Sequence, residues 1–197
     1  MIIHHRRSIR LKNYDYSQPG SYFITLCTIG KSQLFGEIID GEMVLNDVGK
    51  TVEHRLLAIP DHYQDVELDQ WVIMPNHIHA IIVIYPDDVV GARHASPLQL
   101  YKSKIHGPKP RSIGSIVASF KSAATKQINI LHNTPGHSLW QRNYYEHIIR
   151  DEKELNRIRR YIINNPPHWS FDIENRNGLP IDDKQKFWSK FLNEFNA

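Results

Sequence analysis

Two histidines separated by a single residue, His77 and His79, are the side chains whose type and spacing point most directly to chemistry. They open the second of two apolar runs in the segment WVIMPNHIHAIIVI (71–84), and the Pro75-Asn76 pair between the runs predicts two strands joined by a tight turn. Alternate residues of a strand face the same side, so we expect both imidazoles on one face, about 6–7 Å apart. Imidazoles on an apolar strand are costly unless something uses their nitrogens. The pair indicates either half of a metal site or two histidines hydrogen-bonded to backbone or water at the end of a sheet.

A tyrosine and an asparagine in the helix predicted for 151–164 and its end form the second candidate group. Tyr161 and Asn165 are four residues apart, and Arg157 lies one turn before Tyr161, so all three share a helix face. If this helix packs across the histidine strand, a phenol and a metal-competent amide meet the two imidazoles. The alternatives are structural: Tyr161 as a half-buried aromatic anchor, and Asn165 as a C-terminal cap before Pro166.

The distribution of charge favours a polyanionic partner. The net charge is only +3, but no Asp or Glu occurs from Gly91 to Tyr145, and basic residues recur there and in the N-terminal segment. The alternative is a solvated lysine-rich surface, which usually contains interspersed acids. Nucleic acid is the favoured polyanion, and the residues that we expect to contact its phosphates are Arg6, Arg7, Arg10, Lys102, Lys104, Lys121, Lys126 and Arg157.

Composition narrows the class of protein. A chain of 197 residues fits one domain plus an appendage, and 41% hydrophobic residues can build a sizeable core. The single cysteine, Cys27, excludes an internal disulfide and a cysteine-based zinc site. The N-terminus lacks the apolar core of a signal peptide, and no apolar run reaches the length of a membrane span. We therefore expect a cytoplasmic protein without a membrane partner.

The pattern of elements predicts an α+β fold with helices packed on one face of an antiparallel sheet. The expected strands are 22–28, the two arms of a hairpin around Asp40-Gly41, 66–74, a histidine strand from 77 to about 86, and 139–149. The expected helices are one capped by Asn46 or Asp47 and stopped by Pro60, one over 112–130, and one over 152–164. We expect a long loop at 87–111, a catalytic domain over 1–169, and a tail over 170–197 that folds back onto it through a short amphipathic segment.

Four segments together give the sequence a family resemblance. YFITLCT (22–28), MPNHIH (74–79), LWQRNYYEHIIRDE (139–152) and YIINNP (161–166) occur in the order and rough spacing of the REP-associated tyrosine transposases. The chain thus resembles the single-tyrosine branch of the HUH nucleases over residues 6–169. The resemblance implies a ferredoxin-like antiparallel sheet with the histidine pair on a central strand.

The resemblance also implies a reaction and its residues. His77, His79 and Asn165 would bind a divalent metal, Mg²⁺ in the cell with Mn²⁺ accepted, and Tyr161 would be the nucleophile. The tyrosine would attack a phosphodiester of single-stranded or hairpin DNA and form a 5′-phosphotyrosine with a free 3′-OH. A monomer is favoured, because the loop before residue 151 is short, although related insertion-sequence enzymes work as homodimers.

Two other tyrosines, Tyr144 and Tyr145, lie near the aromatic segment. They rank below Tyr161 as nucleophiles because neither is followed by Asn or Gln four residues later. The metal or Arg157 is expected to lower the tyrosine pKa from its usual value near 10, and no general base is identified.

One alternative function is that of a metal-dependent hydrolase without a covalent intermediate, although position 81 is Ile and the strand after it is apolar. The other is a catalytically silent nucleic-acid-binding regulatory protein derived from such a transposase.

Overall fold

The structure, a computed structural model, describes residues 14–86 and 109–193. Its centre is a four-stranded antiparallel sheet in the order β4-β5-β1-β6. The strands are β1 (Gly20–Cys27), β4 (Val66–Met74), β5 (His77–Ile84) and β6 (Tyr145–Ile149). If these four strands are counted in chain order, their order in the sheet is 2-3-1-4, which is that of a ferredoxin-like sheet. The predicted fold class is therefore confirmed. The histidine pair opens β5, which lies between β1 and β4 in the sheet.

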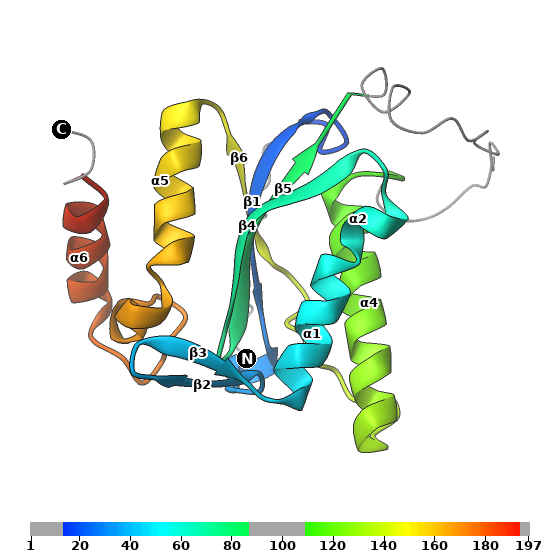
Figure 1. Ribbon diagram of the computed structural model, residues 1–197, viewed down its shortest axis with the longest axis horizontal. Helices are drawn as coiled ribbons and strands as arrows, with labels where there is room; N and C mark the ends of the chain where they lie inside the picture. The colour runs from blue at the N-terminus through cyan, green and yellow to red at the C-terminus, as the bar shows by residue number, and fades with distance from the viewer. Residues whose placement is uncertain (1–13, 87–108, 194–197) are drawn as a thin grey trace, which may run out of the picture.

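Helices cover both faces of the sheet (Figure 1). The helices α1 (Asp47–Leu57) and α4 (Ile113–His132) pack together on one face, and α5 (Glu152–Ile163) lies across the other. Outside α5 lies α6 (Ile181–Asn193), which also contacts the 3₁₀ helix η2 (Pro166–Phe171). The one-sided arrangement expected from sequence therefore describes α1 and α4, and α5 adds a layer on the second face.

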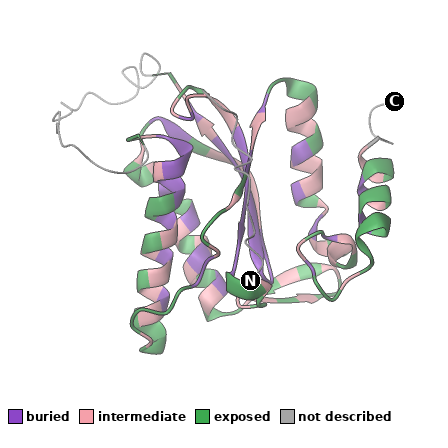
Figure 2. Ribbon diagram, turned by 180° about the vertical axis from the view of Figure 1, so that it is seen from behind, coloured by how far each residue is buried: buried purple, intermediate pink, exposed green. Residues whose placement is uncertain are grey.

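The pattern of β5 explains the two covered faces. Apart from the two histidines, its residues are apolar on both sides, as expected of a strand whose two faces are both covered. Ile78 and Ile82 belong to the large core cluster shared with α4, whereas Ile81 packs with Ile158 and Ile162 of α5. Figure 2 shows buried residues along the middle of the sheet, between the helix layers. The histidine side chains, in phase with Ile81, therefore point toward α5.

Helix α5 is held in place by its cap, its apolar face and one ion pair. The Asp151 side chain accepts a hydrogen bond from the Glu154 backbone N–H and caps the first turn. Arg159 binds the Asp69 carboxylate on β4 through Nε at 2.8 Å and Nη2 at 2.6 Å. These contacts fix how the helix lies across the sheet, and hence where Tyr161 can reach.

The remaining elements follow the sequence pattern with one correction. The hairpin β2 (Gly36–Ile39) and β3 (Glu42–Leu45) turns at Asp40-Gly41, both with positive φ, and forms a separate two-stranded sheet. The helix α1 is capped by the Asn46 side chain and ends before Pro60, which lies in the short α2 (Ile59–His62). The short η1 (Ile29–Lys31) follows β1. In the described ranges, no helix has the length and apolarity that a membrane crossing requires.

The correction concerns the strand predicted for 139–149, which begins only at Tyr145. Leu139 and Trp140 are adjacent in sequence, yet both side chains are buried in the large core cluster. Successive side chains of a regular strand point to opposite faces, so this pair cannot belong to one. The segment instead makes a single bridge, from Trp140 to Thr28.

Candidate metal centre and nucleophile

The two histidines face each other in the interior. His77 is fully buried and His79 is 3% exposed, and their Nε2 atoms are 2.9 Å apart. Both sit at the end of β5 that follows the Pro75-Asn76 turn, and they pair across the sheet with Cys27 and Thr25 of β1. The strand thus presents two ring nitrogens to the same point beneath α5.

Hydrogen bonds on the far side of each ring fix its orientation. The Asn76 side-chain amide donates to the carbonyls of Lys31 and Glu174, so its Oδ1 is left to accept from His77 Nδ1 at 2.8 Å. With the proton on Nδ1, the His77 Nε2 lone pair faces the site, which is the usual arrangement of a metal-binding histidine. Thr25 Oγ1 lies 2.9 Å from Nδ1 of His79 and orients that ring in the same sense.

Burial keeps His77 neutral. Removal from water lowers the pKa of His77 to about 3, against the opposing attraction of Asp172. A neutral imidazole offers a lone pair, and a protonated one does not. The ring is also stacked against Trp169, with centroids 6.0 Å apart. The site therefore holds His77 in the form that can bind a cation.

Tyr161 reaches this point from α5. Its hydroxyl oxygen lies 3.2 Å from His79 Nε2 and 3.3 Å from Asp172 Oδ2. Burial raises the pKa of Tyr161 well above its usual value, and the negative charge of Asp172 adds to the effect. The indole of Trp188 packs edge-on against the phenol ring, with centroids 4.6 Å apart. In this arrangement the phenol is protonated.

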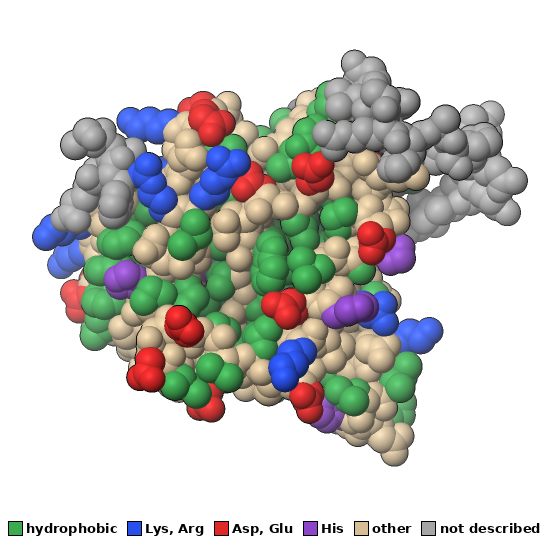
Figure 3. Space-filling view, in the orientation of Figure 1, with side chains coloured by type: hydrophobic (Ala, Val, Ile, Leu, Met, Phe, Trp, Pro, Cys, Tyr) green, Lys and Arg blue, Asp and Glu red, His purple; other side chains and the backbone are tan. Residues whose placement is uncertain are grey.

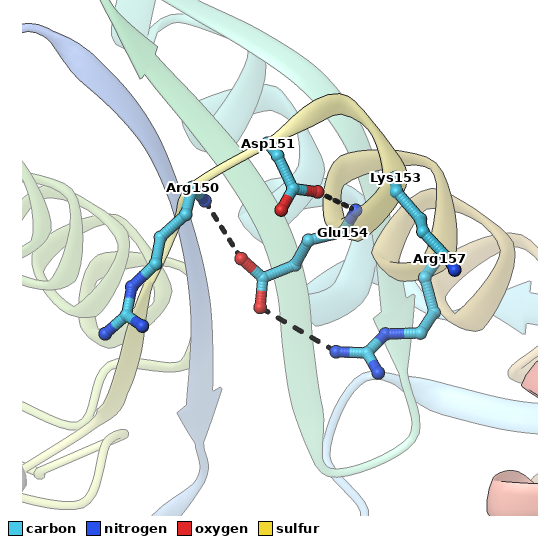
Figure 4. Close-up of a pocket in the computed structure, with 5 residues that line it drawn as sticks. All are labelled: Arg150, Asp151, Lys153, Glu154 and Arg157. Carbon is cyan, nitrogen blue, oxygen red and sulfur yellow. Dashed lines mark hydrogen bonds and ion pairs between the residues drawn. The ribbon is translucent and has the colours of Figure 1, made fainter.

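The expectation that Arg157 lowers the tyrosine pKa is wrong for this arrangement. Its guanidinium lies near the carboxylate of Glu154, with Nη2 3.7 Å from Oε1, as Figure 4 shows. Glu154 also accepts from the Arg150 backbone N–H at 2.9 Å and lies 2.8 Å from His147 Nε2. Basic side chains gather over this part of α5 in Figure 3, but the Arg157 guanidinium is directed to Glu154.

Asn165 turns its amide into the site. The cap of α5 is Asn164, and Asn165 begins η2 without capping it through its side chain. Its Nδ2 donates to Asp172 Oδ2 at 2.8 Å, and its Oδ1 is buried without a hydrogen-bond partner among the described residues. An unpartnered buried oxygen is costly, and a cation would satisfy it.

Asp172 completes the group and was not anticipated from sequence. It follows η2, is fully buried, and places Oδ2 at 3.8 Å from His77 Nε2 and 3.6 Å from His79 Nε2. Burial alone would raise the pKa of Asp172, but the neighbouring histidines and the Asn165 amide hold it well below its usual range. Its Oδ1 accepts from the Glu174 backbone N–H. No motif marks this aspartate in the sequence, and only folding of the C-terminal segment brings it to the histidines.

The four oxygen and nitrogen donors fit a divalent cation. His77, His79 and Asp172 each present a ligand atom, all within 4.8 Å of one another. A histidine binds a metal ion through the lone pair of its neutral ring, so the only ligand charge in such a centre would be that of the Asp172 carboxylate. A dication would overcompensate this single negative charge and leave positive charge for an anionic substrate. The unpartnered Asn165 oxygen supplies a fourth donor. The residues present thus fit a metal centre, and Tyr161 stands beside it.

The basic residues predicted to contact DNA are divided. Arg6, Arg7, Arg10, Lys102 and Lys104 lie outside the described residues. Lys121 and Lys126 lie on α4, across the sheet from the histidines. Tyr145 lies on β6 with 47% exposure, and its ring is 6.1 Å from that of Phe23. Of the tyrosines considered from sequence, Tyr161 is the one that the structure brings to the histidines.

Comparison with other proteins gives a relative and a fold. No model of a protein family matches the chain. An uncharacterized protein from Haemophilus influenzae is 47% identical over 171 residues, which cover 86% of this chain and 93% of the relative. This chain belongs to the same family as that Haemophilus protein. The two therefore share one fold, and the site described above can be sought in both.

A solved structure shows what kind of fold this is. It is a REP-associated tyrosine transposase bound to a REP hairpin, and it superposes on this chain with a TM-score of 0.51 at 20% identity. The superposition covers 81% of this chain and 73% of that one. At this identity the likeness shows a transposase-like fold, and the chemistry has to be argued from the site.

Proposed function

We propose that the protein is a metal-dependent endonuclease and strand transferase that acts on single-stranded DNA next to a hairpin. One observation carries the proposal: the Tyr161 hydroxyl lies 3.2 Å from His79 Nε2, in a buried group that offers donors for a dication. The likeness to a transposase solved with a REP hairpin supports DNA as the substrate. The phenol reaches histidines of its own chain, which supports action as a monomer.

The metal ligands in this proposal are His77, His79, Asp172 and the Asn165 amide oxygen. When bound, a divalent cation supplies charge neutralisation at the non-bridging oxygens of a phosphodiester. Two imidazoles suit Mn²⁺ well, and we propose Mg²⁺ as the ion used in the cell. Asn76 and Thr25 hold the rings so that both Nε2 atoms stay directed at the ion.

The reaction is a transesterification. The Tyr161 oxygen forms a bond to phosphorus while the bond from phosphorus to the 3′-oxygen breaks, and the electron pair leaves with that oxygen. The proton that the phenol gives up balances the one that the 3′-oxygen gains, so no water is consumed. The phosphodiester energy is kept in the tyrosine ester, and a 3′-OH from another strand can reverse the step and join the strands.

A hydrolase without a covalent intermediate is the second candidate, and Asp172 favours it. The histidine strand carries no acid of its own, and the structure supplies a carboxylate from the C-terminal segment. In a hydrolase, water attacks phosphorus and Tyr161 only lines the site. Replacing the tyrosine therefore separates the two candidates.

The test uses a labelled hairpin with a single-stranded flank, incubated with protein and Mn²⁺ and resolved on a denaturing gel. We expect a covalent protein–DNA adduct that Tyr161→Phe abolishes while hairpin binding persists. Tyr145→Phe is the matched control, because it removes a hydroxyl from an exposed tyrosine on β6. Chelation should stop adduct formation, and added Mn²⁺ should restore it. Nicking by Tyr161→Phe at the wild-type rate would establish the hydrolase instead.

A further inference from the structure

A shallow, open groove with basic side chains along it lies between α4 and the segment that follows it, on the side of the sheet opposite α5. Its volume is about 480 Å³. Helix α4 provides one wall, and the segment 136–142 provides the other. The polar groups from the helix are Lys121, Ser122, Thr125, Lys126 and Asn129, and the facing wall adds His137, Ser138 and Arg142.

The charge of the groove is of one sign. Its lining contains three basic residues, Lys121, Lys126 and Arg142, and no carboxylate. Both walls belong to the stretch from Gly91 to Tyr145, which contains no acid in sequence. Lys126 and Arg142 are exposed and stand on opposite walls. A groove with cations on both sides and hydroxyl and amide donors between them suits a polyanion.

Lys121 joins the two walls. Its ammonium donates to the carbonyl of Gln141 at 2.9 Å and to that of Asn143 at 3.4 Å. The ammonium also lies over the ring of Tyr144, 5.5 Å from its centroid. The groove is therefore braced before a ligand enters.

The wall of the groove is attached to the strand that flanks the histidines. The Gln141 backbone N–H donates to the Cys27 carbonyl at 2.9 Å, and the Ile29 N–H donates to the Leu139 carbonyl at 2.9 Å. Cys27 in turn pairs with His77 across the sheet. A ligand held in the groove thus lies beside the end of the sheet where the candidate metal centre begins.

The lining favours a double-stranded stem over a single strand. Single strands are held largely by stacking of bases on open aromatic rings. The one indole, phenyl or phenol ring in the lining is Trp140, which is only 7% exposed. Cations and hydroxyl donors without a stacking platform contact phosphates, which position a duplex without reading its sequence.

We propose that this groove binds the phosphate backbone of the stem of a DNA hairpin and so delivers the single-stranded flank to Tyr161. The inference rests on the proposed function for the choice of DNA, and it adds a binding site separate from the metal centre. Lys126 and Arg142 contact phosphates from opposite walls. Lys121 keeps the walls together through its two carbonyl partners.

The experiment measures binding of a labelled DNA hairpin by fluorescence anisotropy between 50 mM and 200 mM salt. Each lost phosphate contact should lower the slope of log K against log salt by about 0.9. The double variant Lys126→Gln/Arg142→Gln should therefore lower it by about 2, for any stem sequence. Lys50→Gln, an exposed charge on α1 outside the groove, should leave the slope nearly unchanged. An unchanged slope in the double variant, or an equal loss in Lys50→Gln, would overturn the proposal.

Two further experiments distinguish hairpin binding in the groove from catalysis by Tyr161. On an unstructured strand without a stem, the groove variant should form the Tyr161 adduct as wild type does, whereas Tyr161→Phe should form none but still bind the hairpin. If the wild-type protein forms no adduct but the double variant still lowers the salt slope, the nuclease proposal is wrong and the groove proposal stands. An RNA hairpin of the same sequence that binds tenfold more tightly than DNA would refute the choice of DNA.

Discussion

Replacing Asp172 with Asn tests the metal centre without emptying the core. The carboxylate is the negative charge among the four proposed donors, so we expect Asp172→Asn to weaken metal binding by at least about 100-fold, the upper end of what a supporting residue contributes. Folding should suffer little, because the new amide can donate to the unpartnered Asn165 oxygen once the Asn165 side chain turns over. The variant therefore separates a loss of ligand from a loss of structure.

The magnitude follows from linkage. At Mn²⁺ one hundred times above its Kd, binding stabilises the wild-type protein by about 2.7 kcal/mol. In a chain of this size 1 kcal/mol moves Tm by about 2–4 °C, so the wild-type shift is about 5–11 °C. A 100-fold weaker variant at the same concentration gains only about 0.4 kcal/mol, a shift of about 1–2 °C.

The assay is thermal unfolding with and without Mn²⁺, for wild type and two variants. Asp65→Asn is the matched control, because Asp65 is a buried carboxylate that pairs with Arg111 at 2.8 Å, outside the site. We expect this control to lose stability without metal and to keep the full metal-induced shift. An undiminished shift in Asp172→Asn would show that the carboxylate is not a ligand.

Two further predictions concern residues around the site and the groove. Asn76→Ala removes the acceptor that holds His77 Nδ1, and calorimetric titration should show metal affinity reduced by about 10–100-fold; an unchanged affinity would contradict the role given to Asn76. Burial lowers the pKa of Lys121 to about 8 in the folded protein, whereas a lysine in the unfolded chain has a pKa of about 10.4. The unfolded state then binds more protons between these pH values, so the free energy of unfolding should rise with pH across this window. Urea unfolding of Lys121→Met should lose that rise, and an identical pH profile in the variant would refute the assignment.

The fold was largely accessible from sequence because its strands and helices carry local signals. The histidine strand, the Asp40-Gly41 turn and the Asn46 cap are each set by neighbours in the chain, and the structure has all three. The strand expected from 139 failed because Leu139 and Trp140 both enter the core, a tertiary demand that a β-rich composition does not reveal. The local sequence predicts whether a segment forms a helix or a strand. It does not predict where packing in the core ends a strand early.

The candidate site was only partly accessible, for a related reason. The spacing of the histidines, and of Tyr161 with Asn165, follows from the periods of a strand and a helix, so those partners could be paired in advance. Asp172 lies beyond the end of α5, after a short 3₁₀ segment, and no period connects it to the histidines. Arg157 shares a helix face with Tyr161, but its longer side chain pairs with Glu154. Sequence spacing determines which residues share a face of a helix or strand. The end of a long charged side chain such as that of Arg157 is placed by its ion-pair partner instead.

The central claim is that Tyr161 becomes covalently linked to DNA. Mass spectrometry of trypsin-digested adduct tests this directly, because cleavage after Arg160 and Arg176 yields a peptide, YIINNPPHWSFDIENR, with a single tyrosine. We expect the 5′-phosphate and its attached nucleotides on this peptide. Nucleotides found instead on the peptide 143–150, which contains Tyr144 and Tyr145, would contradict the account.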